Sequence, residues 1–203
     1  MLEQLIFQGL VGLSLAMYLW LVAAGLTLIF GVLGVLNFAH GSLYMLGAYF
    51  SYTAVGILGV NFWVGLAVGP LLVALVGGAM ERFFIRRVYK IDLAYQLLLT
   101  FAFILIFADG VKWYWGPIYK SASMPPALDG AVLVFGRPFP VYSLFVIALG
   151  PLVALGLWLL LDKTWWGRTV RAAASDRDMA SAIGVNVPRL FTGVFMFGSW
   201  LGA

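Results

Sequence analysis

The longest uncharged stretch of the chain, residues 5–80, limits its fold more than any other feature of the sequence. It contains no lysine, arginine, aspartate or glutamate and is apolar nearly throughout. A helix that crosses a bilayer needs ~20 apolar residues, so the stretch has room for about three membrane-spanning helices. Lipid offers the backbone no hydrogen bonds, and a helix satisfies its own. We therefore expect an all-α fold, a polytopic transmembrane helical bundle.

The composition of the whole chain agrees with a membrane location. Hydrophobic residues make up 64% of the chain and charged residues 10%, and the mean hydropathy is +1.03. Soluble domains carry about 25% charged residues. The N-terminus has Glu3 and no basic residue before the apolar run, which argues against a cleavable signal peptide. The chain has no cysteine and one histidine, so disulfides, thiol chemistry, a metal site and a bound cofactor are not expected.

Polar segments divide the apolar sequence into about six spans, the last of them incomplete. The expected spans lie near Leu5–Leu33, Ser42–Leu58, Phe62–Met80, Leu93–Val111, Val141–Leu161 and from Leu190 onward. A tight turn is expected at Gly59–Asn61, and a short β-hairpin with its turn at Gly136–Pro138. The last run, Leu190–Ala203, is too short to cross a ~30 Å hydrocarbon core at about 1.5 Å per residue. This length favours a fragment of a longer domain.

Two basic loops, residues 81–92 and 162–189, predict the orientation in the membrane. Their basic residues are Arg82, Arg86, Arg87 and Lys90 in the first loop, and Lys163, Arg168, Arg171, Arg177 and Arg189 in the second. Two expected spans separate the loops, so both face the same side, and the positive-inside rule assigns that side to the cytoplasm. Three expected spans precede the first loop. The N-terminus is therefore expected outside.

Two polar residues, Asn37 and His40, interrupt the apolar sequence between the first two expected spans. Small residues surround them, among them Gly34 and Gly41. A polar pair at membrane depth must bond to neighbouring groups or face a watery cavity. One interpretation is structural, with both side chains bonded to helix ends at a break between the spans. The other is functional, with both side chains touching a permeating solute or gating its exit on the cytoplasmic side.

The second basic loop contains an alanine-rich, amphipathic segment, Thr169–Ile183. Ser175 is a possible N-cap, and Asp176 and Asp178 would then stand in the first turn, where the helix dipole favours acids. Gly184 is a good C-terminal stop. We expect a short surface helix over Asp176–Ile183. It is either a loop helix packed on its own bundle or a docking helix for a cytoplasmic partner.

Three segments give the chain a resemblance to a known family. The first is GLTLIFGVLGVLNFAHG at residues 25–41, followed by YMLGAY at residues 44–49. The second is Glu81-Arg82, after the third expected span. The third runs from Gly167-Arg168 to Gly184-Val185-Asn186. Together they resemble the permease subunit of the branched-chain amino acid ABC transporters, of the smaller of the two permease types.

The resemblance implies a larger machine in the plasma (inner) membrane of a bacterium or archaeon. Members of this family work with a second permease subunit, two cytoplasmic ATPases and an external binding protein that delivers the amino acid. The resemblance makes residues 1–203 the N-terminal part of a permease domain, with a cytoplasmic coupling loop at about 162–189. The coupling residues that it implies for contact with the ATPase are Asp176, Asp178, Met179, Ala180, Gly184, Val185 and Asn186.

The sequence itself contains no Walker A pattern for binding ATP. The chain is therefore expected to be a transport subunit rather than an enzyme, with ATP hydrolysed by its partner. The same permease type also resembles carriers of urea, short amides and aromatic acids, so these substrates remain open.

A secondary transporter or channel that works without an ATPase is the alternative from another class. This alternative predicts charged residues within the membrane. Only Asp109 lies near such a position, close to the end of the fourth expected span, and Lys112, three residues later, can form an ion pair with it. Two glycine pairs, Gly65/Gly69 and Gly198/Gly202, have the spacing of close helix packing.

Overall fold

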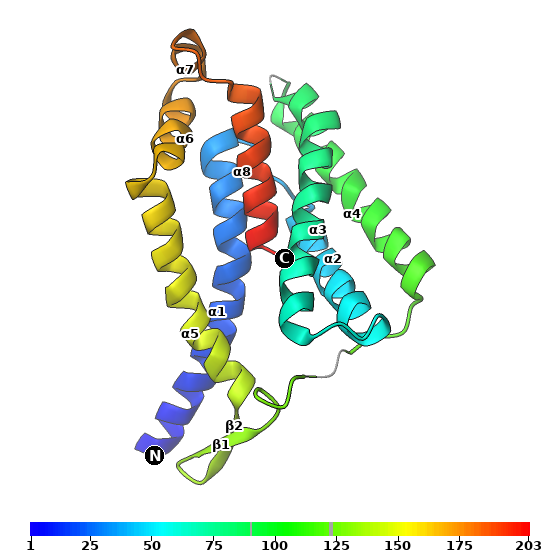
Figure 1. The fold of residues 1–203 in the computed structure, drawn as a ribbon, viewed down its shortest axis with the longest axis vertical. Helices are drawn as coiled ribbons and strands as arrows, with labels where there is room; N and C mark the ends of the chain where they lie inside the picture. Colours follow the sequence, from blue (N-terminus) through cyan, green and yellow to red (C-terminus); the bar gives the residue numbers. More distant parts are fainter. Residues whose placement is uncertain (90, 122–123) are drawn as a thin grey trace.

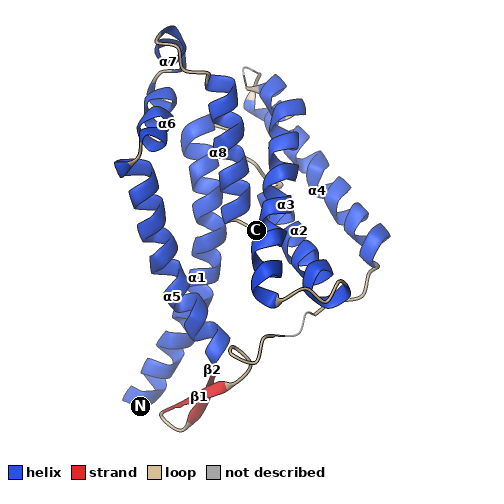
Figure 2. Cartoon of the chain, viewed as in Figure 1, coloured by secondary structure: helices blue, strands red, loops and turns tan. Residues whose placement is uncertain are grey.

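The computed structural model describes residues 1–89, 91–121 and 124–203. Within these ranges the chain is a helical bundle with one small β-hairpin (Figure 2). The α-helices are α1 (Leu2–Leu33), α2 (His40–Tyr52), α3 (Phe62–Phe83), α4 (Leu93–Trp115), α5 (Val141–Trp158), α6 (Trp165–Ser175), α7 (Arg177–Ala182) and α8 (Val187–Leu201). Short π- or 3₁₀-helical turns extend three of them: η1 (Thr53–Ile57), η2 (Ile85–Val88) and η3 (Leu159–Lys163).

Four of these helical segments are long and apolar enough to cross a membrane. They are Leu2–Leu33, Phe62–Val88, Leu93–Trp115 and Val141–Lys163. This confirms a helical membrane bundle, and it leaves the count of six spans a prediction. The second expected span is divided between α2, which has 13 residues, and the turn η1. Its polar start, with His40 as the first residue of α2, shortens the apolar part of that segment.

The helices form two groups that α8 joins (Figure 1). Helices α1 and α5 pack together in one group, and α2, α3 and α4 in the other. Helix α8 lies between α1 and α3 and contacts both. The chain's N-terminus lies at the hairpin end of the molecule, and α7 lies at the opposite end.

Local capping residues explain where several helices begin. The side chain of Asn61 accepts a hydrogen bond from the Trp63 N–H at 2.9 Å and starts α3, and Gly59 has a φ of +66° in the turn before it. The side chain of Asp92 accepts from the Ala94 N–H at 3.0 Å and starts α4. Both are N-cap bonds that satisfy free N–H groups of a first turn. The predicted turn at Gly59–Asn61 is confirmed.

The predicted hairpin exists, but its turn was placed wrongly. Strands β1 (Ala131–Val134) and β2 (Arg137–Pro140) are antiparallel, and Val134 pairs with Arg137. The turn is therefore Phe135-Gly136 rather than Gly136–Pro138. Both turn residues have positive φ, 51° and 74°, as a two-residue hairpin turn that follows the twist of its strands requires.

Close packing at the predicted glycine pairs is confirmed. A Cβ atom added to Gly69 would overlap the Ser51 hydroxyl, so α3 touches α2 there. A Cβ atom on Gly25 of α1 would overlap the carbonyl oxygen of Gly198 of α8. Glycine permits such backbone contact because it has no side chain.

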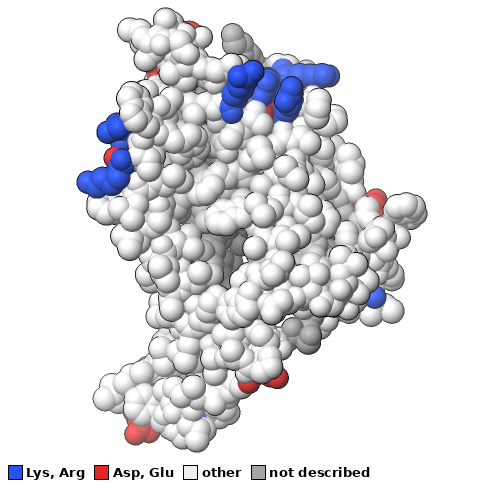
Figure 3. Space-filling model, in the orientation of Figure 1, with Lys and Arg blue, Asp and Glu red and all other residues white. Residues whose placement is uncertain are grey.

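Basic side chains gather at the α7 end of the molecule (Figure 3). The two basic loops, which connect α3 to α4 and α5 to α8, both lie at that end (Figure 1). Lys90, counted in the first loop, lies outside the described residues. The predicted common side of the two loops is thus confirmed, while the cellular compartment that this side faces stays a prediction.

Candidate functional site

The break between α1 and α2 is built by Gly34 and Asn37. Gly34 ends α1 in the left-handed conformation, with φ +66°, and its N–H donates to the Phe30 carbonyl at 2.8 Å. Asn37 is buried, and its Oδ1 accepts a hydrogen bond from the Ala39 N–H at 3.1 Å, immediately before α2. The chain thus leaves α1, runs as non-helical backbone over residues 34–37 and starts a new helix inside the bundle.

His40 ties this break to two other helices. It is buried, and its Nε2 lies 3.1 Å from the Val22 carbonyl oxygen, in the middle of α1. A Cβ atom on Gly202, just after α8, would overlap the same ring. His40 therefore meets α1 at mid-helix rather than at its end. Gly41, the fourth residue predicted at the break, is exposed and has open space around it.

Two polar atoms at the break have no hydrogen-bond partner among the described residues. They are Nδ2 of Asn37 and Nδ1 of His40. Buried donors and acceptors that lack partners are costly, by roughly 1–3 kcal/mol each, unless water or a solute satisfies them. The structural interpretation accounts for the bonds of Asn37 Oδ1 and His40 Nε2. The two unpartnered atoms are what the functional interpretation would use.

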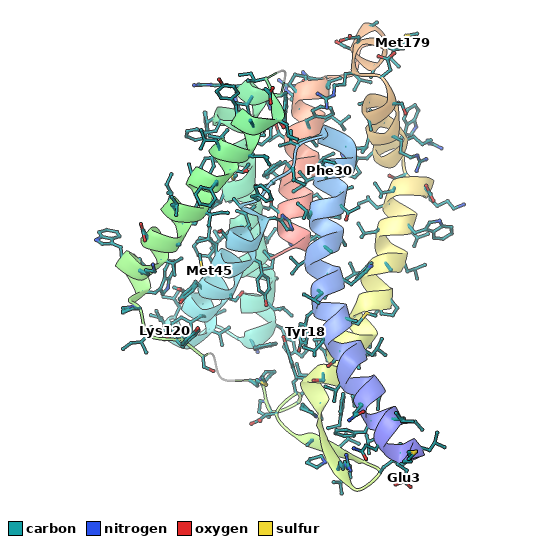
Figure 4. All side chains as sticks on the ribbon, turned by 180° about the vertical axis from the view of Figure 1, so that it is seen from behind. Glu3, Tyr18, Phe30, Met45, Lys120 and Met179 are labelled. Atoms are coloured by element: carbon teal, nitrogen blue, oxygen red, sulfur yellow. The ribbon has the colours of Figure 1, made fainter. Side chains whose placement is uncertain are left out.

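A cavity of about 420 Å³ lies beside His40. It lies between α1 and α5 on one side and α2 and α3 on the other, below the last turn of α8. The face shown in Figure 3 is hollowed there. Val22 and Gly202, which both lie against His40, line the cavity. Its aromatic lining consists of Tyr18, Tyr44, Trp63, Tyr142, Phe145 and Trp200. Tyr18 points toward the middle of the molecule in Figure 4. A space with an apolar wall and phenol groups can accept a small solute that is mostly apolar.

A buried ionic cluster around Glu81 lies at the α7 end of the bundle. This cluster was not predicted from the sequence. Glu81, in the last turn of α3, is fully buried. Its carboxylate accepts hydrogen bonds from Arg86 Nη2 at 3.0 Å, the Tyr89 hydroxyl at 2.7 Å and the Thr192 hydroxyl at 2.7 Å. Arg86 Nη2 also donates to the Pro188 carbonyl at 2.9 Å. The cluster therefore fastens the start of α8 to the end of α3.

The Tyr89 phenol serves this cluster as a donor. Burial, together with its hydrogen bond to Glu81, raises the pKa of Tyr89 well above its usual range. The phenol therefore stays protonated, and its O–H donates a hydrogen bond to the carboxylate. An acid directly after an apolar span, followed five residues later by Arg86, was the signal in the sequence for this cluster.

Helix α7 forms the exposed tip of the α7 end, where Figure 4 labels Met179. Its N-cap is Asp176, whose Oδ1 accepts from the N–H groups of Asp178 at 3.0 Å and Met179 at 2.9 Å. The predicted cap Ser175 was wrong, because Ser175 belongs to the preceding helix α6. Asp176 breaks the helix by adopting an extended backbone, with φ −149° and ψ 106°.

The residues predicted for coupling take different places around α7. Met179 and Ile183 are 63% and 71% exposed, whereas Ala180 is buried against the bundle. Gly184 has a φ of +90° and ends the segment, as predicted. Val185 packs against the core, and the Asn186 side chain accepts from the Arg189 N–H at 3.1 Å as the N-cap of α8. Met179 on α7 and Ile183 directly after it are thus exposed, while Ala180 and Val185 hold the same segment against the bundle.

Comparison with known proteins identifies the family. Residues 10–203 match the family described as the permease component of the branched-chain amino acid transport system. The chain belongs to this permease family. The resemblance predicted from the sequence is confirmed.

Curated members of the permease family align with nearly the whole chain. The high-affinity branched-chain amino acid transport system permease protein LivH of Escherichia coli strain K12 is 27% identical over 205 residues, which cover 95% of this chain and 66% of that protein. The corresponding protein BraD of Pseudomonas aeruginosa is 26% identical over 219 residues, covering 100% of this chain and 68% of BraD. The probable permease LivH of Methanocaldococcus jannaschii is 28% identical over 200 residues, covering 94% of this chain and 61% of that protein. The chain spans about two thirds of the length of these relatives. No solved structure matches it.

Proposed function

We propose that the chain is a permease subunit of an ATP-driven ABC importer for branched-chain or similar amino acids. The match of residues 10–203 to the permease family carries this proposal. The names of its relatives, which describe branched-chain amino acid transport, support the substrate class. The chain does not hydrolyse ATP. A cytoplasmic ATPase does so, beside a second permease subunit and an external substrate-binding protein.

The distribution of charge supports an orientation in the bilayer. With the basic α7 end in the cytoplasm, the positive-inside rule is satisfied, and the N-terminus and the hairpin lie outside. The external binding protein would then deliver its amino acid to the loop between α4 and α5. This location fits a multi-pass protein of a bacterial or archaeal plasma membrane.

The cavity beside His40 is the part of the translocation pathway that this chain contributes. Its apolar wall suits an aliphatic side chain. Neither Asn37 nor His40 is among the residues that line the cavity. Their unpartnered nitrogens are buried at the neighbouring break, where water, or a solute once the break opens, would supply the missing hydrogen bonds. Gly34 and Gly41 allow the backbone of the break to move as the helices rearrange.

A secondary transporter is the second candidate, and the arrangement of charges disfavours it. Ion coupling needs ionisable groups within the membrane. Asp109 lies 3.6 Å from Lys112 near the end of α4, and both side chains are exposed. Among the described residues, the buried carboxylate is that of Glu81 at the end of α3, and it is already paired with Arg86. Carriers of urea, amides or aromatic acids within the same family remain alternatives for the substrate.

Helix α7 with residues up to Asn186 is the docking element for the ATPase. We expect the double variant Met179→Glu, Ile183→Glu to lose at least about tenfold in copurified ATPase, since two charges would enter an apolar contact and a tenfold loss needs only about 1.4 kcal/mol. Both side chains are exposed in the chain alone, so the melting temperature in detergent should not change. The measurement is copurification of the ATPase encoded beside the chain.

The matched control is Ala174→Glu, an exposed position on α6 at the same end of the molecule. It adds a charge outside α7 and should leave ATPase binding unchanged. Equal ATPase recovery with the native chain and the double variant would contradict docking at α7. Failure of the native chain to retain any ATPase would contradict the ABC importer itself.

A further inference from the structure

One cation on α7 reaches back to the end of α1. Arg177, the first residue of α7, donates a hydrogen bond from Nη2 to the Leu33 carbonyl oxygen at 2.6 Å. The last carbonyls of a helix have no partner within the helix and carry partial negative charge. The last turn of α1 contains no basic residue of its own. The positive charge that complements this helix end therefore comes from α7, 144 positions further along the chain.

The same guanidinium group lies against two aromatic rings. Its carbon is 4.9 Å from the ring centroid of Phe191 in α8 and 5.8 Å from that of Tyr89 after α3. Both distances are within the range of cation–π attraction. Tyr89 in turn donates to Glu81 in the buried cluster. Arg177 thus stands where α1, α7, α8 and the loop after α3 meet.

This contact lies directly beside the break. Gly34, which ends α1 in the left-handed conformation, follows Leu33 in the chain. A Cβ atom on Gly34 would lie 3.7 Å from Arg177 Nη2. One side chain therefore joins α7 to the residue at which the break begins.

We propose that Arg177 is a positioning residue that couples movement of α7 to the end of α1. The inference rests on the proposed function, because it takes α7 as the ATPase docking element. When the ATPases move α7, the bond to Leu33 moves the end of α1 and the break that follows it. The stacking on Phe191 moves α8 with them, and α8 leads to Gly202 at the His40 ring. Both connections end beside the cavity.

The test compares Arg177→Gln with native protein in the complete transporter, reconstituted in vesicles with its ATPases, second permease and leucine-loaded binding protein. Expected results are unchanged copurification of the ATPase, retained ATP hydrolysis and at least a tenfold fall in leucine transported per ATP. A residue needed only for folding would lower assembly and hydrolysis together instead. Arg177→Lys should recover part of the transport per ATP, because an ammonium group can bond to the Leu33 carbonyl but cannot stack on two rings as a guanidinium does.

The matched control is Arg189→Gln, which removes one positive charge from an exposed position near the start of α8. It should leave the transport per ATP unchanged. A normal ratio in Arg177→Gln, or an equal fall in Arg189→Gln, would overturn the proposal. If the native complex neither retains an ATPase nor transports, the proposed function itself fails, which is a distinct result.

A second measurement needs no change at Arg177. The chain has no cysteine, so two introduced cysteines in one variant can each carry a spin label. The substitutions are Ser181→Cys on α7 and Gly31→Cys near the end of α1. Both positions are exposed. The proposal expects the distance between the two labels to be the same with and without ATP, because α7 and the end of α1 move together. A nucleotide-dependent change of more than about one helical turn, ~5 Å, would overturn it.

Discussion

Replacing Arg86 by methionine is expected to cost about 3 kcal/mol of folding free energy. The substitution leaves the Glu81 carboxylate fully buried without its cationic partner, with the Tyr89 and Thr192 hydroxyls as remaining donors. Breaking a buried ion pair costs roughly 3–5 kcal/mol, and the lower end applies because the Arg86 side chain is 32% exposed. The measurement is unfolding in mixed micelles, followed by tryptophan fluorescence.

A matched control and a double variant separate the ion pair from general charge effects. Arg87→Met removes the neighbouring, exposed cation and should change the free energy of unfolding by less than about 0.5 kcal/mol. The double variant Glu81→Leu, Arg86→Met should regain most of the loss, because it leaves no unpaired charge. Equal stability of Arg86→Met and Arg87→Met would show that the cluster does not hold α8 to α3.

Substitution of Gly25 by valine is expected to separate α1 from α8. Its Cβ would overlap the Gly198 carbonyl oxygen and lie 3.1 Å from His40 Nε2. Backbone cannot yield as a flexible side chain can, so the cost should reach or exceed the upper end of the roughly 1–3 kcal/mol typical of overpacking. The same unfolding assay measures it, and uptake by the assembled transporter should fall as the His40 contact is displaced.

The control for this variant is Gly31→Val in the same helix. Gly31 has no heavy atom within 4 Å of its Cβ position, so valine there should be tolerated within about 0.5 kcal/mol. The two variants share the residue change, the helix and the increase in volume. If both were equally stable, the contact between α1 and α8 would not be as close as described.

Helix starts could be predicted from the sequence where a local residue determines them. Phe62, Leu93 and Val141 were expected as first residues of spans and are the first residues of α3, α4 and α5. Asn61 and Asp92 form N-cap bonds within two residues of themselves. Such bonds depend on neighbours in the chain, and a single sequence displays them directly.

The links that organise the α7 end could not be predicted in this way. The bond from Thr192 to Glu81 joins positions 111 apart, and that from Arg177 to Leu33 joins positions 144 apart. Neither leaves a periodic pattern in the sequence. The shift of the cap from Ser175 to Asp176 has a similar origin, because buried Val170 and Ala173 hold α6 against the bundle up to that point.

ATP-driven uptake of leucine into vesicles tests the central claim most directly. The chain would be reconstituted with the second permease, the ATPases and the binding protein encoded beside it, and radiolabelled leucine would be supplied with the binding protein. We expect accumulation against a gradient that needs both ATP and the binding protein and that is lost in the Met179→Glu, Ile183→Glu variant. Uptake that proceeds without ATP, driven by an ion gradient alone, would contradict the assignment as an ABC importer permease.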